Sequence, residues 1–411
     1  MISTDATDRT AGAAFTGDSR EIAGVLLKLG ATSYGGPAIM GVMQAELQQK
    51  RQWVSKERFL EGLAVANMLP GATATQLAMF FGYARGGWWG GLLGGLCFVL
   101  PAFVIMLALT IAYARFGVTP IARDALYGLG PVVVGLFAVA VYRLGRTAAS
   151  TVSEAVIVLV AAAALLVTPL GIVAILLLGG AAGLAVFHPG KRRSFVIATA
   201  LVVALAVLGG SWWLTTSAPG AAGEGVPDRG SLTEIGAYFF KVGAFTIGGG
   251  LTMIAFIQDQ VVRQFGWLTP REFIDGLALG QLTPGPVLMI AAYVGYKLAG
   301  IAGAGVAAMA AFLPSFIIML TILPALDRVR KLVWVKAVMR GMAPAVIGVL
   351  AVSLVRLAPA ALPDLITLGL LAATIIALLR FRVDAFKLML AGAVLGVVLS
   401  RVPGAVGFNV F

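Results

Sequence analysis

The chain contains the same unusual pattern twice. Residues 27–46 read LKLGATSYGGPAIMGVMQAE, and residues 240–259 read FKVGAFTIGGGLTMIAFIQD. In each copy a lysine stands among apolar residues, and a Gly-Gly pair follows it. Such a chain must fold as two related halves, and charges and helix breakers inside duplicated apolar segments are typical of secondary transporters. Further matched pairs include Trp53 and Trp267, Phe59 and Phe273, Pro70-Gly71 and Pro284-Gly285, Gly128 and Gly341, Gly135 and Gly348, and Arg143 and Arg356.

The composition excludes a soluble protein. Hydrophobic residues make up 60% of the 411 residues and charged residues 12%, and the mean hydropathy is +0.97. A soluble fold would have too little polar surface, so the sequence predicts an all-α polytopic membrane protein with about 13 transmembrane segments. These apolar segments lie near residues 22–45, 60–84, 88–113, 121–142, 153–168, 171–187, 195–214, 234–257, 274–297, 301–323, 335–356, 362–379 and 385–402.

The segment count predicts an inverted repeat. An odd number of segments precedes the second copy, so the second half enters the membrane upside down. This holds if 60–84 is one broken span; a re-entrant hairpin there would make the count even and the repeats parallel. We expect a polar cytoplasmic tail, an N-terminal half, a Gly- and Pro-rich linker and a C-terminal half, at residues 1–20, 21–216, 217–230 and 231–411, respectively.

The basic residues predict the orientation. The N-terminal tail has no basic start followed by an apolar core, so no cleaved signal peptide is expected. Lys and Arg are more frequent in the loops that share the side of the N-terminus, which predicts a cytoplasmic N-terminus and a periplasmic C-terminus. One loop disagrees, because the count places Lys50, Arg51, Lys56 and Arg58 on the outside.

Lys28 and Lys241 are candidate substrate ligands. A lysine near the middle of a spanning helix costs about 2.5–3.5 kcal/mol, so it needs a partner or a water-filled cavity. Each lysine could extend its aliphatic chain so that its amino group reaches the membrane surface. Alternatively, Lys28 could pair with Glu21 and Lys241 with Glu234, seven residues upstream. Because the two lysines are matched, we favour anion binding, and two positive charges suit a dianion.

The helix breakers beside these lysines are candidate sites for the same anion. Glycine pairs let a helix open, and a broken span exposes backbone N–H groups to an anion. Close helix packing or a simple proline kink are the alternatives. Polar side chains beside the breaks could complete the hydrogen bonds of an oxyanion. The candidates are Ser33, Gly35 and Gly36, Thr246, Gly248 and Gly249, Asn67, Pro70, Gly71, Thr73 and Thr75, and Gln281, Thr283, Pro284 and Gly285.

Two matched carboxylates precede the Pro-Gly breaks. Glu61 and Asp275 could carry protons, or could cap or form salt bridges on the helices that begin at Ser55 and Thr269. We favour the capping or salt-bridge interpretation. The matched arginines near residues 143 and 356 are expected to mark the membrane surface.

Other functional classes find no support in the sequence. One cysteine, Cys97, and one histidine, His188, provide no disulfide framework and no metal or catalytic cluster, and no phosphate-binding loop is present. The formal net charge of +12 comes from dispersed residues rather than a nucleic-acid-binding patch. We therefore expect no enzyme activity, no cofactor, no metal and no nucleic-acid partner. The expected partners are an anion and the lipid bilayer, and a second copy of the chain, forming a homodimer, is a further candidate.

At these motifs the chain resembles the chromate ion transporter family, in its long form with two fused homologous halves. The resemblance rests on LLKLGATSYGGP and FFKVGAFTIGGG, on the stretches that begin at Trp53 and Trp267, and on MLPGATATQ and LTPGPVLMI. It covers roughly residues 21–145 and 234–358. It implies a multi-pass protein of the bacterial inner membrane that exports chromate, a divalent tetrahedral anion, by alternating access and so confers chromate resistance. A sulfate or other oxyanion carrier is the nearer alternative, and a non-transporting scaffold or sensor is the more distant one.

Overall fold

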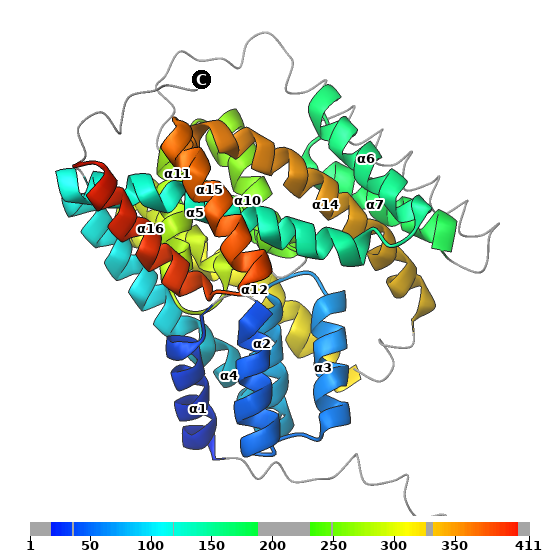
Figure 1. The fold of residues 1–411 in the computed structure, drawn as a ribbon. Helices are drawn as coiled ribbons and strands as arrows, with labels where there is room; N and C mark the ends of the chain where they lie inside the picture. Colours follow the sequence, from blue (N-terminus) through cyan, green and yellow to red (C-terminus); the bar gives the residue numbers. More distant parts are fainter. Residues whose placement is uncertain are drawn as a thin grey trace, which may run out of the picture.

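The computed structural model describes residues 18–34, 37–117, 119–187, 231–247, 250–325 and 332–401, and within these residues it is helical without strands. Four helices are long and apolar enough to cross a membrane: α4, α5, α14 and the continuous stretch Val287–Ala325. The first half contains α1 (Ser19–Thr32), α2 (Pro37–Met43), the π-helix η1 (Gln44–Lys50), α3 (Lys56–Met68), α4 (Thr73–Phe116), α5 (Pro120–Ala148), α6 (Val152–Val167) and α7 (Ile172–Phe187) (Figure 1).

The second half repeats the first element by element. Even the π-helical turn recurs at the matched position, and Gly87 and Gly300 both adopt positive φ at the same sharp kink, in α4 and α12. The expected linker at 217–230 lies outside the described residues. The second-half elements are α9 (Leu232–Phe245), α10 (Leu251–Phe256), the π-helix η2 (Ile257–Gln264), α11 (Pro270–Leu282), the 3₁₀ turns η3 (Val287–Met289) and η4 (Leu323–Ala325), α12 (Ile290–Ile322), α14 (Val333–Ala361), α15 (Leu365–Arg380) and α16 (Ala385–Leu399).

The first apolar segment of each half turns back on itself. The start of α1 lies beside the end of η1, because Trp53 Nε1 donates to Glu21 Oε1 at 3.3 Å and Arg51 pairs with Glu21 at 3.6 Å. In the second half Tyr238 of α9 donates to the carbonyl of Phe256 in α10 at 3.2 Å. Each pair of short helices is therefore a hairpin whose tip is the Gly-rich turn.

The Pro-Gly segments are hairpins as well, which corrects the expectation that 60–84 is one broken span. Phe59 near the start of α3 stacks on Phe81 at 5.7 Å, so α3 and the first part of α4 run antiparallel. Tyr293 of α12 donates to the carbonyl of Glu272 in α11 at 2.8 Å, which gives the same arrangement. All four hairpins return to the side where they start, whereas the count of about 13 spans treated these segments as crossings; that count stays a prediction.

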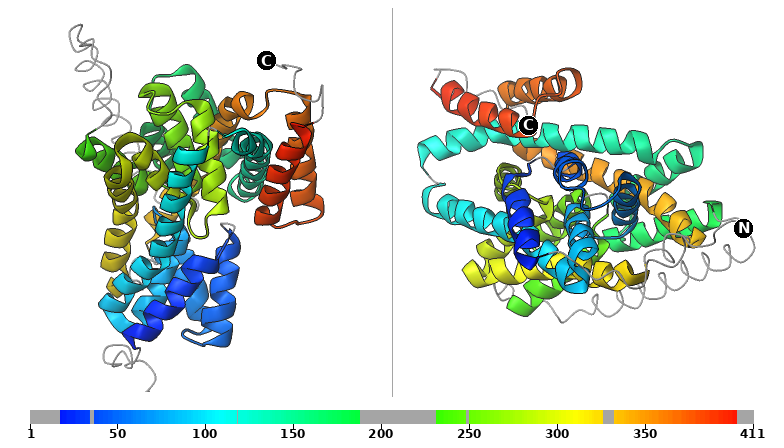
Figure 2. Two further views of the ribbon diagram at one scale, coloured as in Figure 1. Left: turned by 90° about the vertical axis from the view of Figure 1, so that its left-hand side faces the viewer. Right: turned by 90° about the horizontal axis from the view of Figure 1, so that it is seen from below.

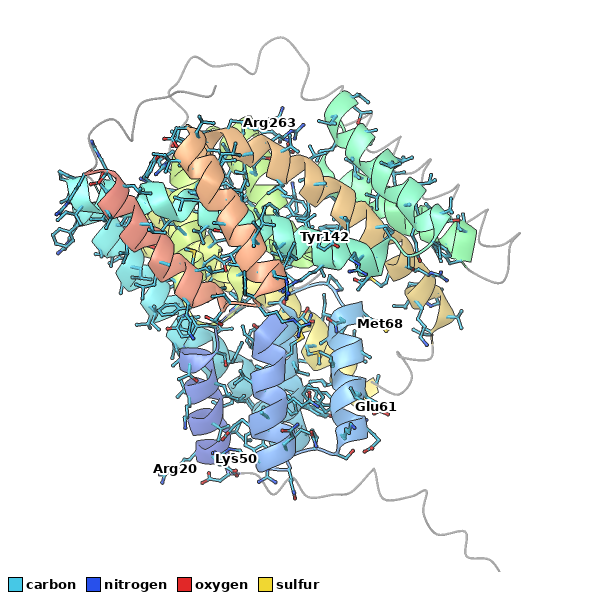
Figure 3. The ribbon with its side chains drawn as sticks, viewed as in Figure 1. Arg20, Lys50, Glu61, Met68, Tyr142 and Arg263 are labelled. Carbon is cyan, nitrogen blue, oxygen red and sulfur yellow. The ribbon has the colours of Figure 1, made fainter. Side chains whose placement is uncertain are left out.

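The repeat is nevertheless inverted. Lys50 and Arg263 are matched positions, and Figure 3 shows them at opposite ends of the molecule. The sequence predicted an odd number of membrane crossings before the second copy. The two hairpins of the first half remove two of these crossings, so the number stays odd and the second half is still inverted. The same hairpins explain the loop that disagreed with the charge bias, because Lys50 lies beside Arg20, at the end where α1 begins (Figure 3). The basic residues of this loop belong on the side of the N-terminus.

The last helices that the structure describes in each half pack on the other half. Helices α6 and α7 contact α14, whereas α15 and α16 contact α5, and both views of Figure 2 show α15 and α16 on the outer side of α5. Glycines permit these contacts: a Cβ at Gly341 would lie 2.1 Å from the carbonyl oxygen of Gly179, and one at Gly128 would lie 2.0 Å from that of Gly392. Small residues at such crossings let membrane helices approach closely.

A polar contact joins the start of α6 to α14, and another joins the start of α15 to α5. Glu154 in the first turn of α6 pairs with Arg340 of α14 at 2.7 Å, and its side chain is 5% exposed. At the matched site, Tyr127 of α5 donates to Asp364, the N-cap residue of α15, at 2.5 Å. The two halves thus hold one another with different chemistry at equivalent positions.

Candidate functional site

The four hairpin tips meet at the centre of the molecule. The backbone N–H of Gly71 in the first Pro-Gly break donates to the carbonyl of Thr246 at 2.6 Å, beside the second Gly-rich turn. The matched N–H of Gly285 donates to the carbonyl of Ser33 at 2.8 Å. These two bonds join each break to the Gly-rich turn of the opposite half, so four of the candidate residues come together in two pairs, Gly71 with Thr246 and Gly285 with Ser33.

Both breaks require glycine. Gly71 has φ +125°, and a Cβ there would lie 2.2 Å from the Oγ of Ser315; Gly285 has φ +94°, and its Cβ would lie 2.8 Å from the Cβ of Ala102. Residues with a side chain rarely adopt such φ values. Ser315 also accepts from the N–H of Ala72 at 3.0 Å. The sequence analysis missed this serine, although it directly follows the matched Pro314.

Unpartnered polar atoms are concentrated in the first half of this centre. Ser33 Oγ, Thr75 Oγ1 and Gln76 Oε1 are buried and have no hydrogen-bond partner within the described part of the chain. Their residues are all 0% exposed. Buried polar groups are normally paired, so such atoms are available to a ligand. Thr73 is also buried, whereas Asn67 is exposed.

The two candidate threonines of the second half hold their hydroxyl groups within their own helices. Thr246 donates to the carbonyl of Val242 at 2.7 Å, and Thr283 donates to that of Leu279 at 2.8 Å. Gln281 is half-buried. Four of the predicted glycines, Gly35, Gly36, Gly248 and Gly249, lie outside the described residues.

The two lysines lie in different environments. Lys28 is exposed and Lys241 is half-buried, and neither forms an ion pair with another described residue. The upstream glutamates are engaged elsewhere, since Glu21 pairs with Arg85 at 3.1 Å and Glu234 caps α9. Pairing of the lysines with these two glutamates is therefore wrong.

The matched carboxylates Glu61 and Asp275 form salt bridges rather than helix caps. Glu61 pairs with Arg58 at 3.0 Å. Asp275 is 5% exposed; it pairs with Arg271 at 3.4 Å and accepts from the hydroxyl of Tyr113 at 2.9 Å. The cap of α11 is formed by Thr269 and Glu272 instead, so the capping alternative is wrong and the salt-bridge alternative is confirmed.

The matched arginines bind across the halves, and their place at the membrane surface stays a prediction. Arg143 donates to the carbonyl of Leu378 in α15 at 2.9 Å, and Arg356 donates to that of Leu165 in α6 at 3.1 Å. Both carbonyls lie in the last turn of their helices, where acceptors lack intrahelical partners. Arg356 also pairs with Asp259 of η2 at 3.3 Å.

The two halves differ in how tightly their first hairpin is packed. Ile254 is 2% exposed and Ala255 is 0% exposed in α10, and α10 contacts α14. At the matched positions of α2, Gly41 is exposed and Val42 is 40% exposed. The hairpin is thus closed against its partner in the second half and open in the first.

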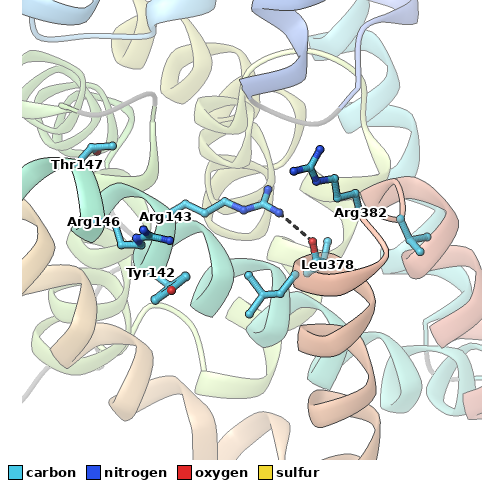
Figure 4. A pocket seen from close by; sticks show the side chains of 8 residues that line it. Tyr142, Arg143, Arg146, Thr147, Leu378 and Arg382 are labelled. Atoms are coloured by element: carbon cyan, nitrogen blue, oxygen red, sulfur yellow. Dashed lines mark hydrogen bonds between the residues drawn. The ribbon is translucent and has the colours of Figure 1, made fainter.

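A cavity of about 780 Å³ lies between the end of α5 in the first half and the end of α15 in the second. Figure 4 shows Arg143 and Arg382 extending toward one another across it. Figure 3 places Tyr142 between the two charged ends of the molecule. The cavity is lined by Tyr142, Arg143, Arg146, Thr147, Leu378, Leu379, Arg382 and Val383.

Comparisons with known proteins agree with this duplicated arrangement. The family model described as Chromate transporter matches the chain twice, at residues 20–184 and 233–397. A chromate transport protein of Cupriavidus metallidurans is 32% identical over 387 residues, which cover 92% of each chain. A probable chromate transport protein of Synechococcus elongatus is 34% identical over 86% of this chain and 88% of its own. A chromate transport protein of Pseudomonas aeruginosa is 32% identical over 81% of this chain and 79% of its own.

No solved structure matches the chain. The two family matches begin at α1 and at α9, and together they span most of the sequence, including all four hairpins. This chain therefore belongs to the chromate transporter family.

Proposed function

We propose that this protein exports chromate from the cytoplasm by alternating access. The observation that carries the proposal is the pair of backbone hydrogen bonds, from Gly71 to Thr246 and from Gly285 to Ser33, that joins four broken segments in one centre. Half-helix ends at such a point are where secondary transporters bind their substrates. The names of the relatives from Cupriavidus metallidurans and Pseudomonas aeruginosa support chromate as the substrate.

The centre has the chemistry that a tetrahedral oxyanion requires. Helix α4 begins at Thr73 without a side-chain cap, so the N–H groups of its first turn and the positive end of its dipole face the break. The hydroxyl groups of Ser33 and Thr75 can donate to the anion. Lys28 and Lys241 would supply positive charge along the route through which the anion reaches this centre.

The difference between the halves supports alternating access. In an inverted repeat, one half shows the closed arrangement that the other adopts after the transition. The Arg356–Asp259 pair closes the second half in this state. In the first half, Arg143 matches Arg356 and Glu46 matches Asp259. Arg143 does not pair with Glu46 in this state, because Glu46 pairs with Arg51 at 2.9 Å and with Lys50 at 3.3 Å. In the opposite state Glu46 would reach Arg143, and Asp259 would leave Arg356.

The buried Asp275 is our candidate for ion coupling, with Glu61 at the matched position. Asp275 pairs with Arg271 of its own helix and accepts from Tyr113 of α4, so a proton that neutralises it would weaken the contact that joins α11 to α4. We place the protein in the bacterial inner membrane with a cytoplasmic N-terminus. The basic loop after η1 then lies on the cytoplasmic side, as the charge bias requires.

The experiment is chromate flux in proteoliposomes with and without an imposed proton gradient. Because Lys28 is exposed, Lys28→Ala removes no packing, and Lys28→Arg is the matched control that keeps the charge. We expect gradient-dependent flux that Lys28→Ala reduces at least about tenfold and Lys28→Arg retains. Normal flux in Lys28→Ala would remove the lysine from the transport route, and the absence of flux of chromate, sulfate and molybdate in the wild type would refute the transport function.

A sulfate carrier is the second candidate, because sulfate shares the charge and shape of chromate and would find the same donors. Complementation separates the two: rescue of a sulfate-uptake mutant without chromate resistance would favour sulfate. A scaffold or sensor predicts no anion flux and tolerance of charge removal at both Lys28 and Lys241.

A further inference from the structure

The cavity between α5 and α15 contains three arginines. Arg143 and Arg146 come from the last turns of α5, and Arg382 comes from the turn that follows α15. Arg382 has φ +52°, a left-handed conformation that residues other than glycine seldom adopt. Surrounding structure must therefore hold this turn in place.

The positive charge in the cavity is not compensated. Arg143 donates to a backbone carbonyl, and Arg146 lies over the ring of Tyr142 at 6.0 Å. No carboxylate of the described residues lies within ion-pair distance of the three guanidinium groups. The nearby Asp384 accepts from the N–H of Phe386 as the cap of α16, and Lys387 in the first turn of α16 adds further positive charge.

The other half shows what this arrangement lacks. Arg356, which matches Arg143, is satisfied by the carboxylate of Asp259. The residues that match Arg146 and Arg382 of the cavity are Pro359 and Pro169, respectively. One arginine with a carboxylate in the second half thus corresponds to three arginines without one in the first.

We propose that this cavity binds a free tetrahedral dianionic oxyanion on its way to the hairpin tips. The inference rests on the proposed transport function and adds a second binding site to it. Two or three planar guanidinium groups can each offer paired N–H donors to such an anion. The first Gly-rich turn packs near this part of the chain, because Tyr34, next to Ser33, contacts the ring of Phe386 in the first turn of α16 at 5.1 Å.

Glu46 gives the site a release step. When the first hairpin closes as the second does in this state, the carboxylate of Glu46 takes the position on Arg143 that Asp259 has on Arg356. A carboxylate and the oxyanion compete for the same guanidinium, so closure expels the anion from the cavity.

The test is equilibrium binding of radiolabelled chromate to the purified protein, with flux measured on the same preparations. The wild type is expected to bind chromate at two sites, and the double variant Arg146→Gln/Arg382→Gln is expected to weaken one of them at least about tenfold and to leave the other unchanged. Both arginines are exposed, so folding should be preserved. Arg380→Gln is the matched control, since Arg380 is exposed in the last turn of α15 and does not line the cavity. Glu46→Gln removes the competitor, so it should bind chromate at least as tightly as the wild type and transport it more slowly.

The outcomes separate this inference from the proposed function. Unchanged chromate affinity in the double variant, with normal flux in the wild type, would overturn the cavity site and leave transport intact. A phospholipid phosphate has the same chemistry as the free oxyanion. Anionic lipid that copurifies with the wild type and is lost in the double variant, without any change in chromate affinity, would assign the arginines to lipid and overturn the proposal.

Discussion

Asp259→Asn should open the side of the protein that is closed in this state. Asp259 of η2 accepts from Arg356 of α14 at 3.3 Å, and their side chains are 9% and 18% exposed. Gln264 donates to the same carboxylate at 2.9 Å. The amide that replaces it keeps the shape of the side chain but loses the negative charge, so the contact that joins the first hairpin of the second half to α14 weakens.

The geometry sets the size of the effect. A hydrogen bond between charged groups contributes about 1.5–3 kcal/mol, and each 1.4 kcal/mol is roughly a factor of ten in an equilibrium constant. Removing the Asp259–Arg356 contact should therefore raise the population of the opposite state by about 10- to 100-fold. Arg263 also reaches Asp259 at 3.5 Å, but its side chain is 49% exposed. Arg263→Gln is the matched control and should change the population less than about fivefold.

Thiol labelling measures this population. Cys97 is the single cysteine, so Cys97→Ser gives a background in which a reporter can be placed at Ala255 on the closed side or at Val42 on the open side. Asp259→Asn should accelerate labelling of Ala255→Cys by a membrane-impermeant maleimide and slow labelling of Val42→Cys. Faster labelling at both positions would indicate loosening of the fold, and unchanged labelling at Ala255→Cys would refute the role of the Asp259–Arg356 contact as a gate.

Three further substitutions test the centre and the contacts between the halves. Gly71→Ala should abolish chromate flux, because its Cβ would lie 2.2 Å from the Oγ of Ser315 at a φ of +125°; flux in proteoliposomes checks this. Arg340→Met leaves the carboxylate of Glu154 buried without its cation and should lower the free energy of unfolding by about 1–3 kcal/mol, which denaturant titration in detergent measures. Thr75→Val replaces a buried hydroxyl that has no partner, so the melting temperature should stay the same or rise while flux falls about tenfold.

The sequence predicted the features that depend on matched residues. Apolar content and the duplicated breakers predicted an all-helical membrane protein with two inverted halves, and the breaks at Gly71 and Gly285 each bond to the Gly-rich turn of the opposite half. Hydropathy could not distinguish a broken span from a hairpin, because an apolar segment has the same composition whether it crosses the membrane or turns back. The aromatic contact between Phe59 and Phe81, far apart in the segment, was the missing information.

The exchange of helices between the halves could not be predicted from the sequence of either half. The matched glycines Gly128 and Gly341 were visible as a pair, but which helix packs on a small residue depends on the tertiary arrangement. The difference between the halves is harder still to predict. Both states of an alternating protein share one sequence, so only a structure can show that Asp259 is paired with an arginine of α14 while Glu46 is not paired with its counterpart in α5.

The exchanged helices explain how the two sides can be coupled. Helix α14, on which the second hairpin closes, is held by α6 and α7 of the first half, and α5 is held by α15 and α16 of the second. Arg356 binds both Asp259 and the end of α6, so it joins the closing hairpin to the opposite half. A movement that separates Asp259 from Arg356 therefore also frees the end of α6. Because the halves hold one another at both α5 and α14, such a movement cannot be confined to one side, which is the physical requirement for opening one side while closing the other.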